Sequence, residues 1–349
     1  MPRGAGRGGR VRLGPGAEFD LIRALVGAAD PHARPGDPSP DQGVWVGPGD
    51  DCAVLEPSDA PWAVTVDMSV EGVHFRREWL SPEEIGWRAA AVSLSDLAAT
   101  AAEPVAILIA LALTAEDRRT GAALALQRGA AAAARAVGAS VAGGDVTRSP
   151  GPLTIDVVAL GRARLPILRS GARPGDEIWV TGRLGGAGAA VSVWERGSTP
   201  TALLRQAFAH PMPRVREALW LAETGSVRAL IDLSDGIAGD VGHLAAASGC
   251  RIVVFAPALP IAAGVAEAVG GAEEALRLAL AGGDDYELCL AAEAGALAGR
   301  VAAFELRFGI ELTRIGVVVE GEGAALDRGD GSPPVSLSGG FDHFGRTGA

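Results

Sequence analysis

The sequence predicts an α/β or α+β protein of two domains. Its 349 residues exceed what one domain usually needs, and 48% of them are hydrophobic, enough for two cores. Short apolar runs typical of strands are interleaved with longer segments typical of helices in both halves of the chain. We expect a disordered Gly- and Arg-rich arm at residues 1–17, a first domain at 18–163 and a second at 164–349.

The first half begins with a helix that ends before Pro31. Ser81 and Glu84 form the capping box of the second helix, with Pro82 in its first turn. Gly138 ends the third helix. The elements expected in this half are, in order, helix 19–30, turn 47–51, strand 62–67, helix 81–93, strand 105–113, helix 115–137 and strand 153–160.

The second half begins near Arg169, and a turn at Gly175-Asp176 leads into its first strand. The elements expected there are strands 177–181, 229–233, 251–255, 286–291 and 312–320 and helices 186–195, 213–222, 236–248 and 294–305.

Composition excludes several classes of protein. A net charge of −11 and a pI near 5.0 argue against a nucleic-acid partner. Three widely spaced cysteines form no CxxC pair, which excludes a zinc ribbon and a disulfide scaffold and favours reduced thiols. All 31 basic residues are arginines. A Walker A lysine and a Schiff-base lysine are therefore absent, and any bound phosphate must be neutralised by metals or arginines.

Targeting and membrane signals are absent from the sequence. Residues 1–17 lack the apolar segment of a signal peptide. The longest apolar run, residues 105–114, is about half the roughly 20 residues that a membrane span needs. We therefore expect a cytoplasmic protein without a membrane partner.

Aspartates beside glycines or at the ends of apolar runs are the main candidates for chemistry. Carboxylate oxygens suit magnesium, and converging carboxylates need cations between them. Each aspartate alone is also explained by a turn or a helix cap, because aspartate accepts from backbone amides there. The aspartates that stand out are Asp50, Asp51, Asp67, Asp96, Asp145, Asp232, Asp235, Asp284 and Asp285.

Other candidates also have two explanations. Gly143-Gly144 and Gly282-Gly283 let backbone amides approach a phosphate or simply form tight turns. His74 is a donor to an anionic substrate or a partly buried aromatic residue. Arg169 is a phosphate-binding fork or a surface residue.

A covalent nucleophile is not evident. The sequence has no Gly-x-Ser-x-Gly elbow, and each cysteine lies in an apolar context. These observations favour metal-assisted group transfer without a covalent intermediate.

Several motifs, in this order over residues 17–344, resemble the thiamine-monophosphate kinase family. They are GDDCAVL, VTVDMSVEGVHF, SLSDLAAT, AGGDVTRSPGPL, LRSGARPGD, IDLSDGIAGDVGHL, AGGDDYELC and GFDHF. The superfamily also contains aminoimidazole ribonucleotide synthetase and selenophosphate synthetase. The resemblance implies an N-terminal mixed-sheet domain that dimerises through its sheet, and a C-terminal α/β domain.

The resemblance also implies a reaction and a set of site residues. The γ-phosphoryl group of ATP passes directly to thiamine monophosphate, giving thiamine diphosphate and ADP, with several Mg²⁺ ions as cofactors and a homodimer as the assembly. Asp67, Asp145 and Asp232 are the implied catalytic residues. The implied metal ligands are Asp51, Thr65, Asp67, Asp96, Asp145, Asp232 and Asp235. ATP contacts are assigned to Gly144, Asp145, Arg169 and Ser234, and thiamine monophosphate contacts to His74, Asp284 and Phe341.

Three positions depart from the family pattern. Asp284 stands where glutamate is common, and Ser338 stands where a tryptophan often stacks on thiamine, which leaves Phe341 for that contact. Val66 stands beside the implied metal ligand Asp67, at a position where family members tend to have threonine or serine. The alternatives are another ATP-dependent enzyme of the superfamily or a non-catalytic homologue that binds nucleotide or metal.

Overall fold

The computed structural model describes residues 17–32, 37, 43–48 and 52–339. The chain divides into two compact units, residues 1–97 with 102–164, and residues 98–101 with 165–349. Residues 1–16 of the predicted arm and residues 49–51 of the predicted turn lie outside the described residues. Among the described helices, none has both the length and the apolar character needed to cross a membrane.

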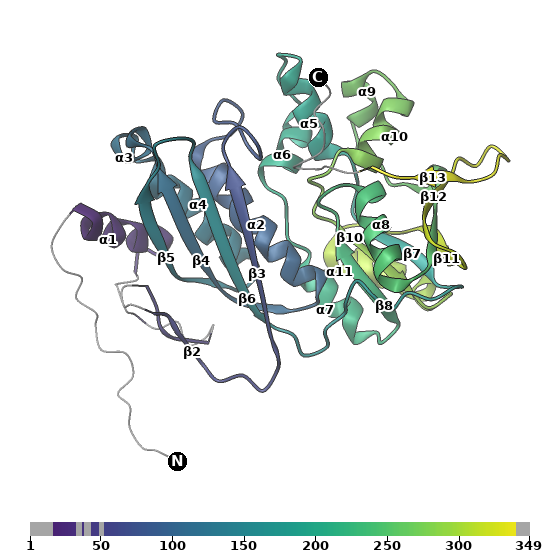
Figure 1. The fold of residues 1–349 in the computed structure, drawn as a ribbon, viewed down its shortest axis with the longest axis horizontal. Coiled ribbons are helices and arrows are strands. Elements are labelled where there is room, and N and C mark those ends of the chain that lie inside the picture. The colour runs from purple at the N-terminus through teal and green to yellow at the C-terminus, as the bar shows by residue number, and fades with distance from the viewer. Residues whose placement is uncertain (1–16, 33–36, 38–42, 49–51, 340–349) are drawn as a thin grey trace. The chain divides into compact units, whose positions relative to one another are not determined.

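The first unit is built on a four-stranded sheet with the order β3-β6-β4-β5 (Figure 1). Strand β6 is antiparallel to both of its neighbours, and β5 is parallel to β4. The strands are β3 (Trp62–Val70), β4 (Glu103–Leu113), β5 (Ser140–Arg148) and β6 (Thr154–Arg162). A small sheet pairs β1 (Val44–Val46) with β2 (Val54–Leu55).

Helices cover one face of this sheet. They are α1 (Ala17–Ala29), α2 (Pro82–Ala99), α3 (Ala115–Thr120) and α4 (Ala122–Ala136). The predicted capping box is present, since Ser81 and Glu84 exchange hydrogen bonds at the start of α2. Helices α2 and α4 cross closely, because a Cβ on Gly86 would lie only 1.9 Å from the carbonyl oxygen of Leu126.

The two faces of the four-stranded sheet differ in exposure. Side chains that point toward the helices, such as Val157, are buried. On the opposite face, Val64, Val66 and Met68 of β3 are 62%, 59% and 58% exposed. Alternation along a strand sends successive side chains to opposite faces, so β3 presents apolar groups on the face without helices.

Two expectations for this unit are wrong. The single helix expected at 115–137 is broken at Gly121, whose φ of 75° ends α3 and starts α4. Gly143-Gly144 is not a turn but part of β5. Glycine is required there by close packing, since a Cβ on Gly144 would lie 2.0 Å from the carbonyl oxygen of Ile109.

The second unit is built on a seven-stranded mixed sheet with the order β13-β12-β9-β11-β7-β10-β8. Its strands are β7 (Glu177–Thr181), β8 (Val227–Asp232), β9 (Arg251–Phe255), β10 (Leu288–Ala292), β11 (Leu312–Val319), β12 (Gly323–Asp327) and β13 (Val335–Leu337). Its helices are α5 (Gly186–Glu195), α6 (Ala202–Ala209), α7 (Val215–Glu223), α8 (Ile237–Ser248), α9 (Val265–Val269), α10 (Ala272–Ala281) and α11 (Val301–Phe308).

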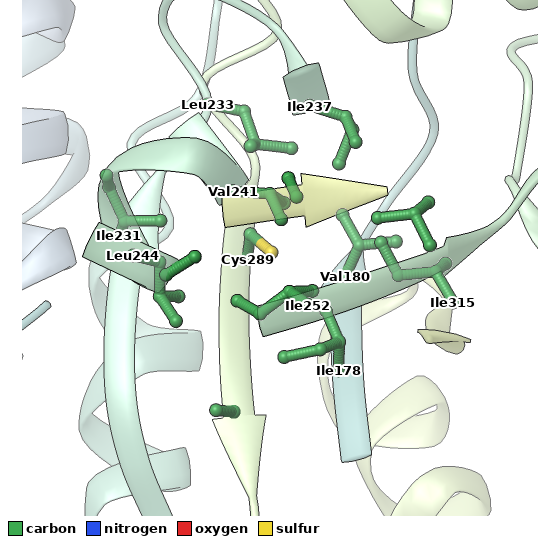
Figure 2. Packing of buried hydrophobic residues seen from close by; sticks show 14 of the residues in the cluster. Ile178, Val180, Ile231, Leu233, Ile237, Val241, Leu244, Ile252, Cys289 and Ile315 are labelled. Carbon is green, nitrogen blue, oxygen red and sulfur yellow. The ribbon is translucent and has the colours of Figure 1, made fainter. Parts of the chain in front are cut away.

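The core of this unit lies between α8 and the sheet (Figure 2). Ile237, Val241 and Leu244 are spaced to share one face of α8, and all three are fully buried. They pack with sheet residues that include Ile252 and Cys289. The predicted bounds of β7, β9, α5 and α8 agree with the structure to within one residue. The sequence did not predict α6, α9, α10, β12 or β13 at all.

Candidate functional site

In the first unit, Thr65 and Asp67 on β3 lie close to Asp96 on α2. The hydroxyl of Thr65 donates to Oδ2 of Asp96. Burial and the negative charge of Asp96 raise the pKa of Asp67 to about 6. Oδ2 of Asp67 is buried and has no hydrogen-bond partner among the described residues. A buried carboxylate oxygen without a donor is costly unless a cation or a proton satisfies it.

This trio fits a magnesium ion. Magnesium takes hard oxygen ligands and is usually held by one or two carboxylates, with water and substrate phosphates completing its coordination. Asp67 and Asp96 supply two carboxylates, and Thr65 supplies a hydroxyl. Among the described residues, no group of three or more His, Cys, Asp or Glu side chains is arranged to hold a metal. The predicted ligand Asp51 lies outside those residues.

The structure does not place Asp145 beside Asp67. In the sheet register, Asp145 pairs with Ala110, which pairs with Asp156 on β6. Paired residues share a face, so Asp145 and Asp156 lie on the face opposite to Asp67, which pairs with Val157. Burial raises the pKa of Asp156. A cavity of about 100 Å³ on that face is lined by Ala110, Leu111, Ala112, Asp145, Thr147, Thr154 and Asp156.

His74 lies in the turn that follows β3. The backbone amide of Val70 donates to Nδ1 of His74 at 3.0 Å. A ring nitrogen that accepts carries no proton, so the neutral imidazole holds its proton on Nε2 and can donate from there. The turn is closed by a backbone hydrogen bond from Gly72 to Phe75.

Arg77 anchors this turn, although it is not among the candidates chosen from the sequence. Its guanidinium donates to both carboxylate oxygens of Glu71 and to both of Asp117. Asp117 is fully buried, forms the capping box of α3 with the N-cap residue Thr114 and accepts from the hydroxyl of Thr114. The spacing of Thr114 and Asp117 could have predicted the cap, but no local pattern reveals that Arg77 reaches it.

In the second unit, Asp232 is the last residue of β8, and Ser234 and Asp235 lie in the loop that leads from β8 to α8. Asp240, in the first turn of α8, accepts from the backbone amide of Asp235 through Oδ2 at 3.1 Å. Burial and the charges of Asp232 and Asp235 raise the pKa of Asp240 to about 8. Asp240 is not among the candidates chosen from the sequence, although an acidic residue at a helix start was a usable signal.

The GGDDYE loop, residues 282–287, runs alongside the loop that carries Ser234 and Asp235. The backbone amide of Asp284 donates to the carbonyl oxygen of Ser234 at 2.8 Å, and that of Tyr286 donates to Leu233 at 2.8 Å. Two motifs that lie about 50 residues apart in the sequence are therefore neighbours in the fold. The sequence predicts a strand that starts at Tyr286, but β10 begins only at Leu288.

Polar contacts fix both ends of the GGDDYE loop. Both carboxylate oxygens of Asp285 accept from the backbone amide of Gly185, at 2.9 and 3.1 Å. Burial raises the pKa of the Asp285 carboxyl group well above its usual range. Glu287 accepts two hydrogen bonds from Arg214 and one from the hydroxyl of Thr181.

The remaining residues named from the sequence are Arg169, Ser338 and Phe341. Arg169 is exposed, and its carbonyl oxygen accepts from the hydroxyl of Ser248. Ser338 is exposed as well. Phe341 lies outside the described residues.

Comparisons with known proteins identify the family. Residues 49–163 match the model of the AIR synthase related protein N-terminal domain, and residues 173–328 match that of its C-terminal domain. Thiamine-monophosphate kinase of Salmonella typhimurium is 37% identical over 311 residues, covering 86% of this chain and 92% of the relative. That of Rhodopirellula baltica is 36% identical over 287 residues, covering 79% and 84%. The chain belongs to the thiamine-monophosphate kinase family.

Solved structures of thiamine-monophosphate kinase share the fold. The enzyme from Stenotrophomonas maltophilia K279a superimposes with a TM-score of 0.75 at 36% identity, covering 90% of this chain and 97% of that one. A structure described as AaThiL complexed with AMPPCP and TMP has a TM-score of 0.70 at 30% identity, covering 84% and 91%. The resemblance seen in the sequence and the mixed α/β fold class are both confirmed.

Proposed function

We propose that this protein transfers the γ-phosphoryl group of ATP to thiamine monophosphate, giving thiamine diphosphate and ADP. The observation that carries the proposal is the hydrogen bond from the Asp284 amide to the Ser234 carbonyl. This hydrogen bond joins two loops. The loop with Ser234 is proposed to bind the nucleotide, and the loop with Asp284 is proposed to bind the acceptor. Support comes from relatives named thiamine-monophosphate kinase and from the neighbour solved with AMPPCP and TMP.

The proposed metal site is centred on Thr65, Asp67 and Asp96. The buried oxygen of Asp67 that lacks a donor supports this assignment, because a cation would satisfy it. Magnesium, when bound, neutralises phosphate charge during transfer, which a chain without lysine needs. Asp51, Asp145, Asp232 and Asp235 are proposed as ligands of further magnesium ions, and Asp145 lies on the opposite face of the sheet from Asp67.

The proposed ATP contacts are Gly144, Asp145, Arg169 and Ser234. The exposed Arg169 has the planar donor group that suits a phosphate. Asp67, Asp145 and Asp232 are the proposed catalytic residues, which hold and orient the reacting phosphates through the cations. The acceptor is itself a phosphate and needs little deprotonation, so positioning and charge neutralisation suffice for direct in-line transfer without a covalent intermediate.

His74, Asp284 and Phe341 are the proposed contacts to thiamine monophosphate. The hydrogen bond from Val70 to Nδ1 supports a donating role for Nε2 of His74 toward an anionic group. Asp284 is an acceptor for the amino group or the cationic ring of the thiamine moiety.

The proposed assembly is a homodimer formed through the open face of the four-stranded sheet. Val64, Val66 and Met68 are more than half exposed there, and a second copy would bury them. We further propose residues 18–163 and 164–349 as the functional domains. The proposed location is the cytoplasm, where ATP is available and cysteines like the free Cys52, Cys250 and Cys289 stay reduced.

The test measures ADP release from ATP and magnesium with thiamine monophosphate, with thiamine or with neither. We expect release and thiamine diphosphate formation only with thiamine monophosphate. Asp67→Asn should lower turnover by about 100-fold or more, as should chelation of the metal. Asp59→Asn, which alters an exposed aspartate paired with Arg164, is the matched control and should retain activity. Absence of turnover in the wild-type protein despite ATP binding would reject this acceptor and favour another enzyme of the superfamily.

A further inference from the structure

The GGDDYE loop contains two residues in a backbone conformation that L-amino acids avoid. Asp284 has a φ of 63° and Tyr286 a φ of 49°. A positive φ is uncommon for aspartate and is an outlier for a bulky side chain such as tyrosine. Such conformations persist only where the surroundings impose them, and they concentrate at functional sites.

Two backbone hydrogen bonds and one side-chain contact hold this conformation. The amides of Asp284 and Tyr286 donate to the carbonyl oxygens of Ser234 and Leu233, as described above. Between them, Asp285 is held by the amide of Gly185. The backbone at Asp284 and Tyr286 therefore turns both side chains in directions that an ordinary strand would not allow.

The result is a direct contact between the two side chains. The hydroxyl of Tyr286 donates to Oδ1 of Asp284 at 2.9 Å. The tyrosine is only 5% exposed, so its ring is fixed by packing, whereas Asp284 is half-buried. A hydrogen bond from a fixed hydroxyl to one carboxylate oxygen prevents the carboxylate from rotating and sets the direction of the other oxygen.

We propose that Tyr286 is the positioning residue that orients the Asp284 carboxylate toward the cationic or amino-bearing ring of the acceptor. This inference rests on the proposed function. Tyr286 acts only through Asp284, whose short side chain has to be held in one direction to serve as a binding group. The role concerns acceptor affinity and not phosphoryl transfer itself.

The test compares steady-state kinetics of Tyr286→Phe, Asp284→Ala and the double variant. Tyr286→Phe keeps the ring and removes only the hydroxyl. We expect it to raise KM for thiamine monophosphate about tenfold, the scale of one hydrogen bond to a charged group. The kcat and the KM for ATP should each stay within twofold of the wild-type values. In the Asp284→Ala background, Tyr286→Phe should have no further effect, because the group it positions is gone.

Thr224→Val is the matched control. It removes a hydroxyl that donates to the carbonyl oxygen of Leu221 in the same unit. An equal rise in KM in this control, an unchanged KM in Tyr286→Phe, or additive effects in the double variant would overturn the proposal. Absence of turnover with thiamine monophosphate in the wild-type protein would instead reject the proposed function, and this inference with it.

A second measurement covers the case in which Tyr286→Phe does not fold. Tyr286 is the only tyrosine of the chain, so a tyrosine ¹³Cζ label gives one NMR resonance that reports its hydroxyl. We expect this resonance to shift when thiamine monophosphate binds and to shift in Asp284→Ala. A resonance that responds to neither change would overturn the proposal.

Discussion

Arg77 donates hydrogen bonds to both carboxylate oxygens of Asp117, a fully buried residue 40 positions further along the chain. The same guanidinium holds both oxygens of Glu71, and Glu71 also accepts from the amide of Leu153 at 3.0 Å. One arginine thus ties the turn that carries His74 to α3 and to the start of β6.

Replacing Arg77 by methionine should destabilise the first unit by about 2 kcal/mol. The change leaves the carboxylate of Asp117 buried without its cation, and partial exposure of Arg77 moderates the cost. Urea denaturation measures the effect. Arg119→Met is the matched control, because Arg119 lies on α3, the helix that carries Asp117, and makes an exposed ion pair with Glu116, so no change is expected. Equal stability of the two variants would contradict a structural role for Arg77.

The same network predicts a loss of stability in acid. Arg77 lowers the pKa of Glu71, and for Asp117 the hydrogen bonds from Arg77 and Thr114 outweigh burial and lower its pKa as well. An acid whose pKa is lower in the folded state stabilises the fold above its unfolded pKa, near 4 here. That stabilising contribution disappears as the pH falls through the pKa of the folded state. The difference in unfolding free energy between wild type and Arg77→Met should therefore be full at pH 7 and smaller at pH 3. A difference that is independent of pH would exclude this linkage.

Substitution by alanine should have opposite effects on stability at two helical glycines. A Cβ on Gly86 of α2 would lie 1.9 Å from the carbonyl oxygen of Leu126, so Gly86→Ala should destabilise the protein by about 2 kcal/mol. Gly27 of α1 has nothing within 4 Å of its Cβ position, so Gly27→Ala should stabilise α1 by about 0.5 to 1 kcal/mol. Thermal unfolding of both variants checks the pair, and a loss of similar size in both would show that the helix crossing is not the cause.

A charge on the open sheet face should prevent the proposed dimer. Met68→Glu places a second carboxylate beside Asp156, with which Met68 is paired in the sheet, so a second copy would have to desolvate two like charges there. We expect light scattering to give the mass of a dimer for the wild type and of a monomer for the variant. Leu306→Glu, at a residue that is 90% exposed on α11, is the control and should remain dimeric. A wild-type mass of one chain would reject the dimer outright.

The sequence by itself determined the family, the mixed α/β class and most of the strands and longer helices. Local physics accounts for this success. The capping box of Ser81 and Glu84 marks the start of α2, and the spacing of Ile237, Val241 and Leu244 marks the buried face of α8. It also named Asp284 as a candidate from the glycines beside it, whereas Ser234 was named through the family resemblance. Their assigned roles stay predictions.

The tertiary structure alone decided which candidates meet. Whether Gly143-Gly144 turns or continues as β5 depends on close packing against β4, which no neighbouring residue reveals. The period-two alternation of the sheet separates Asp67 from Asp145, and that separation depends on pairing register. Tyr286 meets Asp284 only because hydrogen bonds to a distant loop impose a positive φ on both. These contacts are stabilised by partners that lie far away in the sequence, so neighbouring residues alone do not predict them.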